Sequence, residues 1–324
     1  MMAASFLSSF LYSGKFIAQI LCRKSSFPVT FQGVSVVSEK INWYPGHMEK
    51  AIRRIEEKLK IIDAVIELRD ARIPVSSSNP RLEDMLLDQE LLVVLNKRDL
   101  ANEKHTEEWI EFLSQDYSAF ACSSTEKVGC SRVAERLKNI REDFLKRKRE
   151  KGLTSGELKV LVVGVPNCGK STFINAISRR GGVKTGKKPG VTRGHQWLKI
   201  EEGIRVMDTP GLLWPDIEDE EQGYKLAMCG SVRPEVVDTE LLACRLLDCL
   251  RQKNPAGLKE RYNIEISPGD HSYDLLADIG RRRGCLVSGG QVDRERAGNI
   301  VLKEFQSGQL GRVSLESVED IRRE

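Results

Sequence analysis

Residues 164–171 read GVPNCGKS, a stretch that restricts the chain to a small set of folds. It follows a short apolar run, KVLVVG at 159–164, and it leads into KSTFINAIS at 170–178, which has helical spacing. A glycine-rich turn between a buried strand and a helix, ending in Gly-Lys-Ser, is the pattern of a phosphate-binding P-loop. A bare turn is the alternative, but it rarely has this ending. The pattern therefore predicts a nucleotide site.

Each position of this loop has a chemical task. Glycines let backbone N–H groups approach the phosphates, the Lys170 ammonium can neutralise the β and γ oxygens, and the Ser171 hydroxyl can ligate Mg²⁺. The expected nucleotide-binding residues are Asn167, Cys168, Gly169, Lys170, Ser171 and Thr172. The loop alone does not tell which base is bound.

A second stretch, VVLNKRDL at 93–100, predicts guanine as the base. The Asp99 carboxylate can accept two hydrogen bonds from the N1–H and the 2-amino group of guanine, which adenine does not offer. Asn96 would bond the base and the neighbouring loop, while the Lys97 stem would cover the ring. The motif ends an apolar strand pattern, and open α/β sheets bind ligands at that edge. Ser123, at the end of the expected strand AFACS, could add a backbone contact to the base.

Two further motifs predict a metal site and a sensor of the γ-phosphate. Asp208-Thr-Pro-Gly211 ends an apolar run, so Asp208 would hold Mg²⁺ through water and the Gly211 amide would sense the γ-phosphate. Thr192, in KKPGVTR, is placed to complete the metal shell. Either motif alone would be an ordinary turn, but in this order after a P-loop they indicate GTP or GDP with Mg²⁺.

The order of these motifs is reversed relative to an ordinary GTPase, in which the phosphate loop precedes the base-reading motif. A sheet can be joined in another strand order when the old termini lie close together. A long basic helix expected at 132–151 could carry the chain from the base-reading strands to the strand at 159–164. The reversal therefore predicts a circular permutation, in which both motifs are functional.

Periodicity along the chain predicts an α/β fold. Short apolar runs rich in β-branched residues predict parallel strands at 64–70, 91–96, 119–123 and 159–164, and HQWLKI and IRVMD (195–208) predict a hairpin. Amphipathic stretches predict helices at 49–61, 79–89, 104–115 and 132–151. After residue 225 the patterns are helical, with Pro and Gly breaks at 234, 255, 268 and 289–290. The expected fold is a mostly parallel six-stranded sheet with helices on both faces, followed by a small all-α domain.

The charge of the chain permits an RNA partner. The formal net charge is +4, and residues 132–199 hold 18 Lys and Arg against 5 acidic residues. Such runs are commonly solvated helix faces. Beside a nucleotide switch, a phosphate-backbone partner is the better interpretation. The eight cysteines are scattered without a CxxC pair, which points to free thiols in a reducing compartment.

The first forty residues form an N-terminal extension with a different composition. They are rich in Ser, have no acidic residue before Glu39, and have an apolar part that Lys15 interrupts. An organellar transit peptide has these features. An over-extended gene start is an equal alternative, whereas the apolar part is too short for a membrane anchor.

The motifs together resemble the ribosome biogenesis GTPase A (YlqF/RbgA) family of circularly permuted GTPases, which includes mitochondrial and plastid relatives. The resemblance covers almost all of 41–316 and rests on INWYPGHM, DARIPVSSSNP, LNKRDL, GVPNCGKST, KPGVTR, DTPGLLWP, GRRRGCLVSGG and GQLGRVSLE. It implies a permuted GTPase domain at 41–222, a helical RNA-contacting domain at 223–324, and a role in late maturation of the large ribosomal subunit. CSST at 122–125 departs from the family's last guanine motif, and Cys168 stands where the family usually has Val.

The resemblance also implies catalytic groups that a Ras-like enzyme lacks. The position of the Ras-like glutamine, just after the DxxG motif, is Leu212, which cannot orient a water molecule. By resemblance, His47 of the WYPGHM segment supplies this group, although a structural His that caps the following helix is an alternative. The resemblance further suggests that Asn167 lets K⁺ bind beside the phosphates and take the place of an arginine finger. An Asn that only braces the loop is the alternative. The catalytic set is then His47, Lys170, Thr192 and Gly211.

These features predict a GTPase that assembles the large ribosomal subunit, slow alone and stimulated by the subunit, with nucleotide state controlling binding. The expected partners are the subunit precursor, its rRNA and ribosomal proteins, for a monomeric chain without integral membrane contact. A bacterial source would place it in the cytoplasm, and a genuine transit peptide in the mitochondrial matrix or plastid stroma. A nucleotide-dependent rRNA-binding scaffold with negligible turnover is the main alternative. A P-loop enzyme that phosphorylates a small molecule would leave NKRD without a role.

Overall fold

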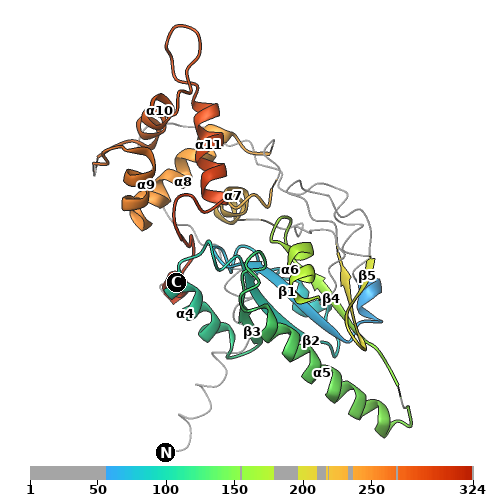
Figure 1. Cartoon of the computed structure of the whole chain (residues 1–324). Helices are drawn as coiled ribbons and strands as arrows, with labels where there is room; N and C mark the ends of the chain where they lie inside the picture. Colours follow the sequence, from blue (N-terminus) through green and yellow to red (C-terminus); the bar gives the residue numbers. More distant parts are fainter. Residues whose placement is uncertain are drawn as a thin grey trace, which may run out of the picture.

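The structure, a computed structural model, describes residues 56–153, 155–178, 196–209, 217, 219–232, 236–267 and 269–322. Its two main parts are a sheet with flanking helices and a group of helices beyond the carboxyl ends of the parallel strands (Figure 1). Among the described residues, no helix is long and apolar enough to cross a membrane.

The sheet has six strands in the order β3-β2-β1-β4-β6-β5. All neighbouring pairs are parallel except the hairpin of β5 and β6. The strands are β1 (Ala64–Asp70), β2 (Glu90–Asn96), β3 (Ser118–Ala121), β4 (Leu158–Val163), β5 (Gln196–Glu201) and β6 (Ile204–Asp208). The expected mostly parallel six-stranded sheet is therefore confirmed.

The strand order also confirms the permutation. β4, which precedes the P-loop, lies in the middle of the sheet between β1 and β6. Helix α5 (Cys130–Glu150) follows the edge strand β3 and leads back to this central strand, as expected for the stretch 132–151. One long connection thus lets the base-reading strands come first in the chain and the phosphate-binding strands second.

Helices cover both faces of the sheet. The side chains of β1 alternate between the two faces, and every one of its residues is buried, so each face is covered. Ala64, Ile66 and Leu68 belong to the same apolar cluster as the inner faces of α5 and α6 (Lys170–Ile177). Val65 points the other way, into a cluster with Leu82 of α3 (Leu82–Met85). Helix α4 (Glu103–Leu113) packs on the β2 and β3 end.

Two expected elements are shorter than the sequence indicated. The stretch 79–89 contains only the four-residue α3, because the chain after Met85 turns extended at Leu86 and leads into β2. Strand β3 ends at Ala121 instead of Ser123. Beyond Ala121 the Cys122 carbonyl accepts from Arg98 N, and Ser123 forms an isolated bridge with Val128, so this segment joins loops and leaves the ladder.

The C-terminal part is helical, as expected. Its helices are α7 (Glu220–Met228), α8 (Thr239–Lys253), α9 (Pro255–Tyr262), α10 (Ser272–Arg282) and α11 (Arg294–Gln306). Pro255 starts α9 at a position where a helix tolerates the missing N–H, so this expected break is the beginning of a helix. The boundary expected at 222 falls inside α7, and the division into domains stays a prediction.

The chain returns to the sheet after α11, which the sequence did not indicate. Residues 311–316, here called the strap, bind the loops that follow β1 and β2: Leu315 N donates to Arg72 O at 2.9 Å and Val313 N to Leu100 O at 3.0 Å. The short helix α12 (Val318–Arg322) then packs against α4, so the C-terminus lies beside α4 (Figure 1).

Glu316 fixes the end of the strap. Its buried carboxylate accepts from Val75 N at 2.8 Å, from Ser76 N at 3.2 Å and from the Ser76 hydroxyl, and Lys225 Nζ lies 3.5 Å away. One side chain thus satisfies the donors of a loop that lies about 240 positions earlier in the chain.

Glu316→Gln should lower the free energy of unfolding by about 1–3 kcal/mol, because the new amide group would face N–H donors and leave one of them unsatisfied. Equilibrium denaturation measures this change. Glu265→Gln is the control, since the Glu265 side chain is 95% exposed. Equal stability of the two variants would show that the Glu316 carboxylate contributes nothing to the stability of the fold.

Candidate nucleotide site

The candidate site lies where the parallel strands end. Asp70 and Asn96 are register partners at the last residues of β1 and β2, and Asp208 ends β6 beside β4. The P-loop begins directly after β4. The carboxyl ends of parallel strands lie along one side of the sheet, where α/β proteins bind ligands. The separate motifs therefore converge there.

The P-loop has a backbone that phosphates can approach. Gly169 has φ +99°, and a Cβ on this residue would lie 2.4 Å from the Asn96 amide nitrogen. Gly164 has φ +154°, and its Cβ would lie 2.3 Å from Leu68 O. Only glycine fits at both positions, which is why the loop needs these residues.

Lys170 lies in this loop with its ammonium directed at backbone carbonyls. Its Nζ is 3.0 Å from Gly164 O and 2.9 Å from Val165 O, and the residue is buried. A lysine held at the centre of the loop can exchange these neutral acceptors for phosphate oxygens, which are stronger acceptors. This placement suits the expected charge-neutralising role.

Two expected Mg²⁺ ligands lie side by side. The Ser171 hydroxyl donates to the Asp208 carboxylate at 2.8 Å, although the two residues come from α6 and β6. A hydroxyl and a carboxylate at this separation suit a magnesium ion that phosphate oxygens and water also coordinate. Within the described ranges there is no cluster of three His, Cys, Asp or Glu that could bind a metal.

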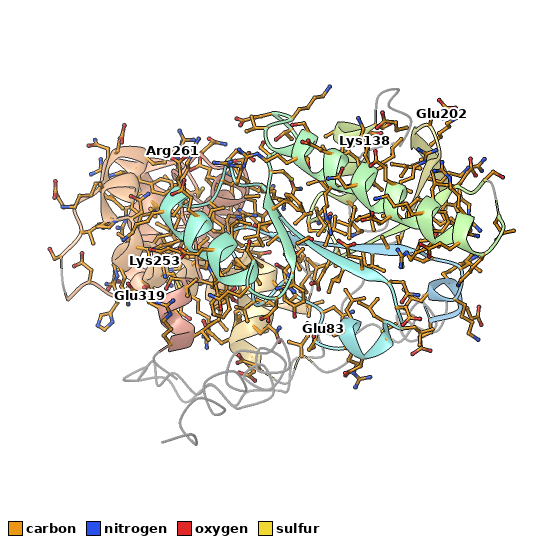
Figure 2. The ribbon with its side chains drawn as sticks, turned by 90° about the horizontal axis from the view of Figure 1, so that it is seen from below. Glu83, Lys138, Glu202, Lys253, Arg261 and Glu319 are labelled. Carbon is orange, nitrogen blue, oxygen red and sulfur yellow. The ribbon has the colours of Figure 1, made fainter. Side chains whose placement is uncertain are left out.

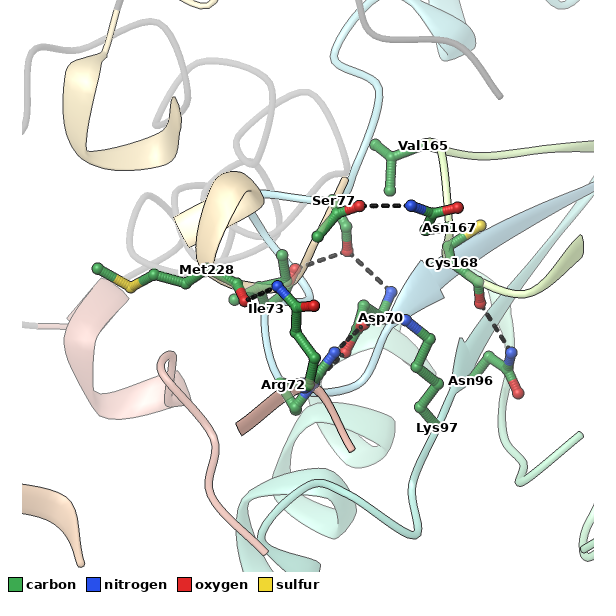
Figure 3. A network of polar contacts seen from close by, with 12 residues as sticks. Asp70, Arg72, Ile73, Ser77, Asn96, Lys97, Val165, Asn167, Cys168 and Met228 are labelled. Carbon is green, nitrogen blue, oxygen red and sulfur yellow. Dashed lines mark hydrogen bonds and ion pairs between the residues drawn. The ribbon is translucent and has the colours of Figure 1, made fainter. Parts of the chain in front are cut away.

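Asn96 joins the base-reading motif to the P-loop. Its amide nitrogen donates to Cys168 O at 2.8 Å (Figure 3), and its amide oxygen accepts from Ser124 N at 3.1 Å and from the Ser124 hydroxyl at 2.6 Å. One buried carboxamide therefore holds three loops in place. The reversed motifs form one site.

Asp99 has a buried carboxylate oxygen that can accept a hydrogen bond from a ligand. Its Oδ1 is buried and has no hydrogen-bond partner among the described residues. Buried polar atoms are normally paired, so an orphan acceptor beside a nucleotide loop suits a ligand that brings its own N–H groups. Guanine does so through N1–H and its 2-amino group.

Ser124 is a residue of this loop that the sequence did not single out, and the expected contact of Ser123 with the base stays a prediction. The Ser123 amide donates to Val128 O at 2.9 Å and its hydroxyl accepts from Glu126 N at 3.2 Å, so Ser123 shapes its own loop. Ser124 contacts Asn96. This contact lies beyond the early end of β3, which no local pattern indicated.

The other P-loop residues have distinct positions. Cys168 is fully buried with its thiol near Lys170 Nζ, burial raises the pKa of that thiol, and its carbonyl accepts from Asn96. Thr172 lies half-buried in the first turn of α6. Asn167 has φ +58°, and its amide nitrogen donates to Gly230 O at 2.6 Å, which links the P-loop to the turn after α7 (Figure 3).

Three expected site residues, His47, Thr192 and Gly211, lie outside the described residues. A buried cluster that sequence reasoning did not assign lies between the described motifs. Asp70 binds both Lys97 Nζ, at 2.9 Å, and the Arg72 guanidinium, at 2.8 Å (Figure 3). The only signal in the sequence was a charged Asp-Ala-Arg at the end of an apolar strand.

The sheet order, the P-loop and the base-reading motif together define a circularly permuted P-loop GTPase. A family model described as "50S ribosome-binding GTPase" matches residues 159–255. The chain is 38% identical over 281 residues to the "Ribosome biogenesis GTPase A" of Bacillus cereus, covering 86% of this chain and 95% of the relative.

A mouse relative, "Mitochondrial ribosome-associated GTPase 1", is 33% identical over 294 residues, covering 85% of this chain and 89% of the relative. A crystal structure described as GNP-bound YlqF from Thermotoga maritima has a TM-score of 0.61 at 30% identity, covering 83% of this chain and 98% of the other. The chain belongs to the ribosome biogenesis GTPase A family.

Asp99→Asn should weaken GTP binding by at least ~1 to 3 kcal/mol, because an amide donor would replace an acceptor opposite guanine N–H groups. Xanthosine triphosphate, which has a carbonyl in place of the 2-amino group, should bind the variant better than GTP does. Calorimetry measures both affinities.

The exposed Asp88 provides the control variant Asp88→Asn, which should bind GTP as the wild type does. Wild-type protein that binds ATP as tightly as GTP would show that Asp99 does not read the base.

Proposed function

We propose that the chain is a GTP-hydrolysing assembly factor for late maturation of the large ribosomal subunit, and that its nucleotide state controls its affinity for rRNA and the subunit. The observation that carries this proposal is the joining of NKRD to the P-loop through Asn96. This contact joins the motif expected to read guanine to the loop expected to bind phosphates, in a chain whose relatives are named for ribosome biogenesis. The relatives include a bacterial protein and a mouse protein that is named as mitochondrial, so membership of the family does not assign a compartment.

In this proposal the nucleotide is bound with Mg²⁺ and K⁺. Ser171 and Asp208 would hold Mg²⁺, with Thr192 completing its shell when GTP is bound and the Gly211 amide sensing the γ-phosphate. The Asn167 amide nitrogen is engaged with Gly230 O, which leaves its amide oxygen as the atom that K⁺ would take. A cation there would offset charge that develops on the phosphates, as Lys170 does from the other side.

The hydrolytic group in this proposal is His47. Leu212 occupies the position where a Ras-like enzyme has its water-orienting glutamine, and a leucine has no acceptor. A neutral imidazole has one acceptor nitrogen, which can orient a water for in-line attack on the γ-phosphate. If the subunit orders the WYPGHM segment, turnover is slow in the free protein and faster on the ribosome.

Two basic surfaces would contact rRNA. The C-terminal end of α5 presents Arg147, Arg149 and Lys151 to solvent. The end of α10 is also basic, and the loop after it projects from the helical part with Leu286 and Val287 each 48% exposed (Figure 1). Figure 2 shows Lys138 of α5 at the sheet end of the molecule and Arg261 of α9 at the helical end; these two side chains pair with Glu201 and Glu304, so the exposed basic residues near them would make the contacts. Contacts from both ends suit a partner with an extended phosphate backbone.

Co-sedimentation with large ribosomal subunits in GDP, GTP and a non-hydrolysable GTP analogue tests the proposal. Binding should be tightest with the analogue and should fall steeply as salt rises, because phosphate contacts release counterions. Replacing Arg147, Arg149 and Lys151 by Gln should reduce the slope of log affinity against log salt by roughly 2–3. Lys104→Gln, at a side chain that is 81% exposed on α4, is the control. An affinity for the subunit that depends on neither the bound nucleotide nor the salt concentration would contradict the proposal.

His47→Ala should leave GTP and GDP affinity nearly unchanged and reduce subunit-stimulated turnover by on the order of 10²-fold, the scale of a positioned acid–base group. Single-turnover phosphate release measures this change. His271→Ala is the control, since His271 is exposed and makes no capping hydrogen bond at the start of α10. Normal turnover with a lower melting temperature would make His47 a structural residue.

A further inference from the structure

One buried carboxylate lies between the base-reading loop and the helical part. Asp70 is fully buried, and its two oxygens bind Arg72 as a fork, with Nε 3.0 Å from Oδ1 and Nη2 2.8 Å from Oδ2. Lys97 Nζ lies 2.9 Å from the same Oδ2 (Figure 3). Burial opposes ionisation of this carboxyl, but the two positive charges prevail and hold its pKa well below the ordinary value.

The Lys97 contact restrains the base-reading loop. Lys97 has φ +61°, an unusual conformation for a residue with a side chain, which persists only where the surroundings enforce it. Its side chain is 21% exposed whereas that of Asp70 is fully buried, so the lysine stem runs from the buried carboxylate toward the surface. A stem tethered at its ammonium is held ready to cover a guanine ring.

The Arg72 contact reaches the end of α11. Nη1 lies 3.3 Å from Phe305 O, and the guanidinium lies 5.0 Å from the centre of the Phe305 ring. Phe305 is in the last turn of α11, where carbonyls lack helical partners and favour a cation. The strap also binds Arg72, whose carbonyl accepts from Leu315 N.

A second route links the same end of α11 to the P-loop. Gln306 donates to Met228 O at 3.0 Å and packs against Gly230. Gly230 O accepts from Asn167 of the P-loop at 2.6 Å. The end of α11 is therefore connected to the base side of the site and to its phosphate side, and Figure 3 shows Arg72, Asp70 and Lys97 on the first route and Met228 and Asn167 on the second.

We propose that Asp70 and Arg72 are positioning residues: Asp70 tethers Lys97 for guanine binding, and Arg72 transmits the position of this loop to the end of α11. The proposal rests on the guanine site proposed above. It predicts that nucleotide binding in the free protein stabilises the last turn of α11 through this ion-pair cluster.

The test compares three variants by nucleotide affinity and by hydrogen exchange of residues 298–306 with and without GDP. Asp70→Asn should weaken GDP binding about tenfold or more, the loss of a charge-assisted contact, and should abolish the GDP-dependent protection of α11. Arg72→Lys keeps a positive charge beside Asp70 but lacks the fork that also reaches Phe305 O. It should therefore weaken GDP binding less than Asp70→Asn does and still abolish the protection.

Arg69→Lys is the matched control. Arg69 lies on β1 next to Asp70, in a similarly buried ion pair with Glu67 at 2.5 Å, and among the described residues it has no hydrogen bond or ion pair with Lys97 or α11. This variant should keep both the affinity and the protection of α11. Should Asp70→Asn fail to fold, the comparison of Arg72→Lys with Arg69→Lys decides alone.

Three results would overturn the proposal: absence of GDP-dependent protection at α11 in the wild type, persistence of that protection in Arg72→Lys, or its equal loss in Arg69→Lys. Failure of the guanine site itself is distinguishable, because the wild type would then bind GDP no better than ADP in the same titration.

Discussion

The carboxamide of Asn96 is the contact on which the nucleotide site depends. It donates to the P-loop at Cys168 O and accepts from the backbone and hydroxyl of Ser124, so the loops after β2, β3 and β4 are held by one side chain. A carboxylate could not donate, and an apolar side chain could do neither. Because the amide is buried, each of its hydrogen bonds also avoids the cost of an unpaired polar group.

The permuted order attaches the helical part near both sides of the nucleotide site. The chain leaves the sheet after β6, at the phosphate side, and enters α7. It returns through the strap, which binds Leu100 next to the base-reading motif and Arg72 at the end of β1. In an ordinary strand order, the chain would not leave the sheet after this strand. Here the two attachment points flank the site, which is the connectivity that the proposed coupling between the loops and the helices requires.

Local patterns were sufficient for most strands and for the P-loop, because a buried parallel strand is a continuous apolar run and the P-loop glycines are required by the backbone. They were insufficient for the end of β3 and for the role of Ser124, whose contact with Asn96 joins residues 28 positions apart in the sequence. The strap could not be predicted, because Glu316 meets Val75 across about 240 positions of sequence. Domain limits and the roles of His47, Thr192 and Gly211 remain predictions.

The charges at this edge of the sheet require an explanation other than stability. In a buried ion pair such as Asp70 with Arg72, the attraction between the charges must offset the cost of removing both from water. Well-packed apolar side chains would not incur that cost. What an ion pair adds is direction, since a guanidinium fork binds a carboxylate by two parallel hydrogen bonds in a restricted geometry. Lys97 and Lys170 are both held by acceptors within the protein, at Asp70 and at P-loop carbonyls. Lys170 can exchange its carbonyl acceptors for phosphate oxygens, whereas in the proposal above Lys97 keeps its ion pair with Asp70 while its stem covers the base. Because acceptors for Lys170 lie within the loop itself, its ammonium keeps a partner when a phosphate binds and when it leaves.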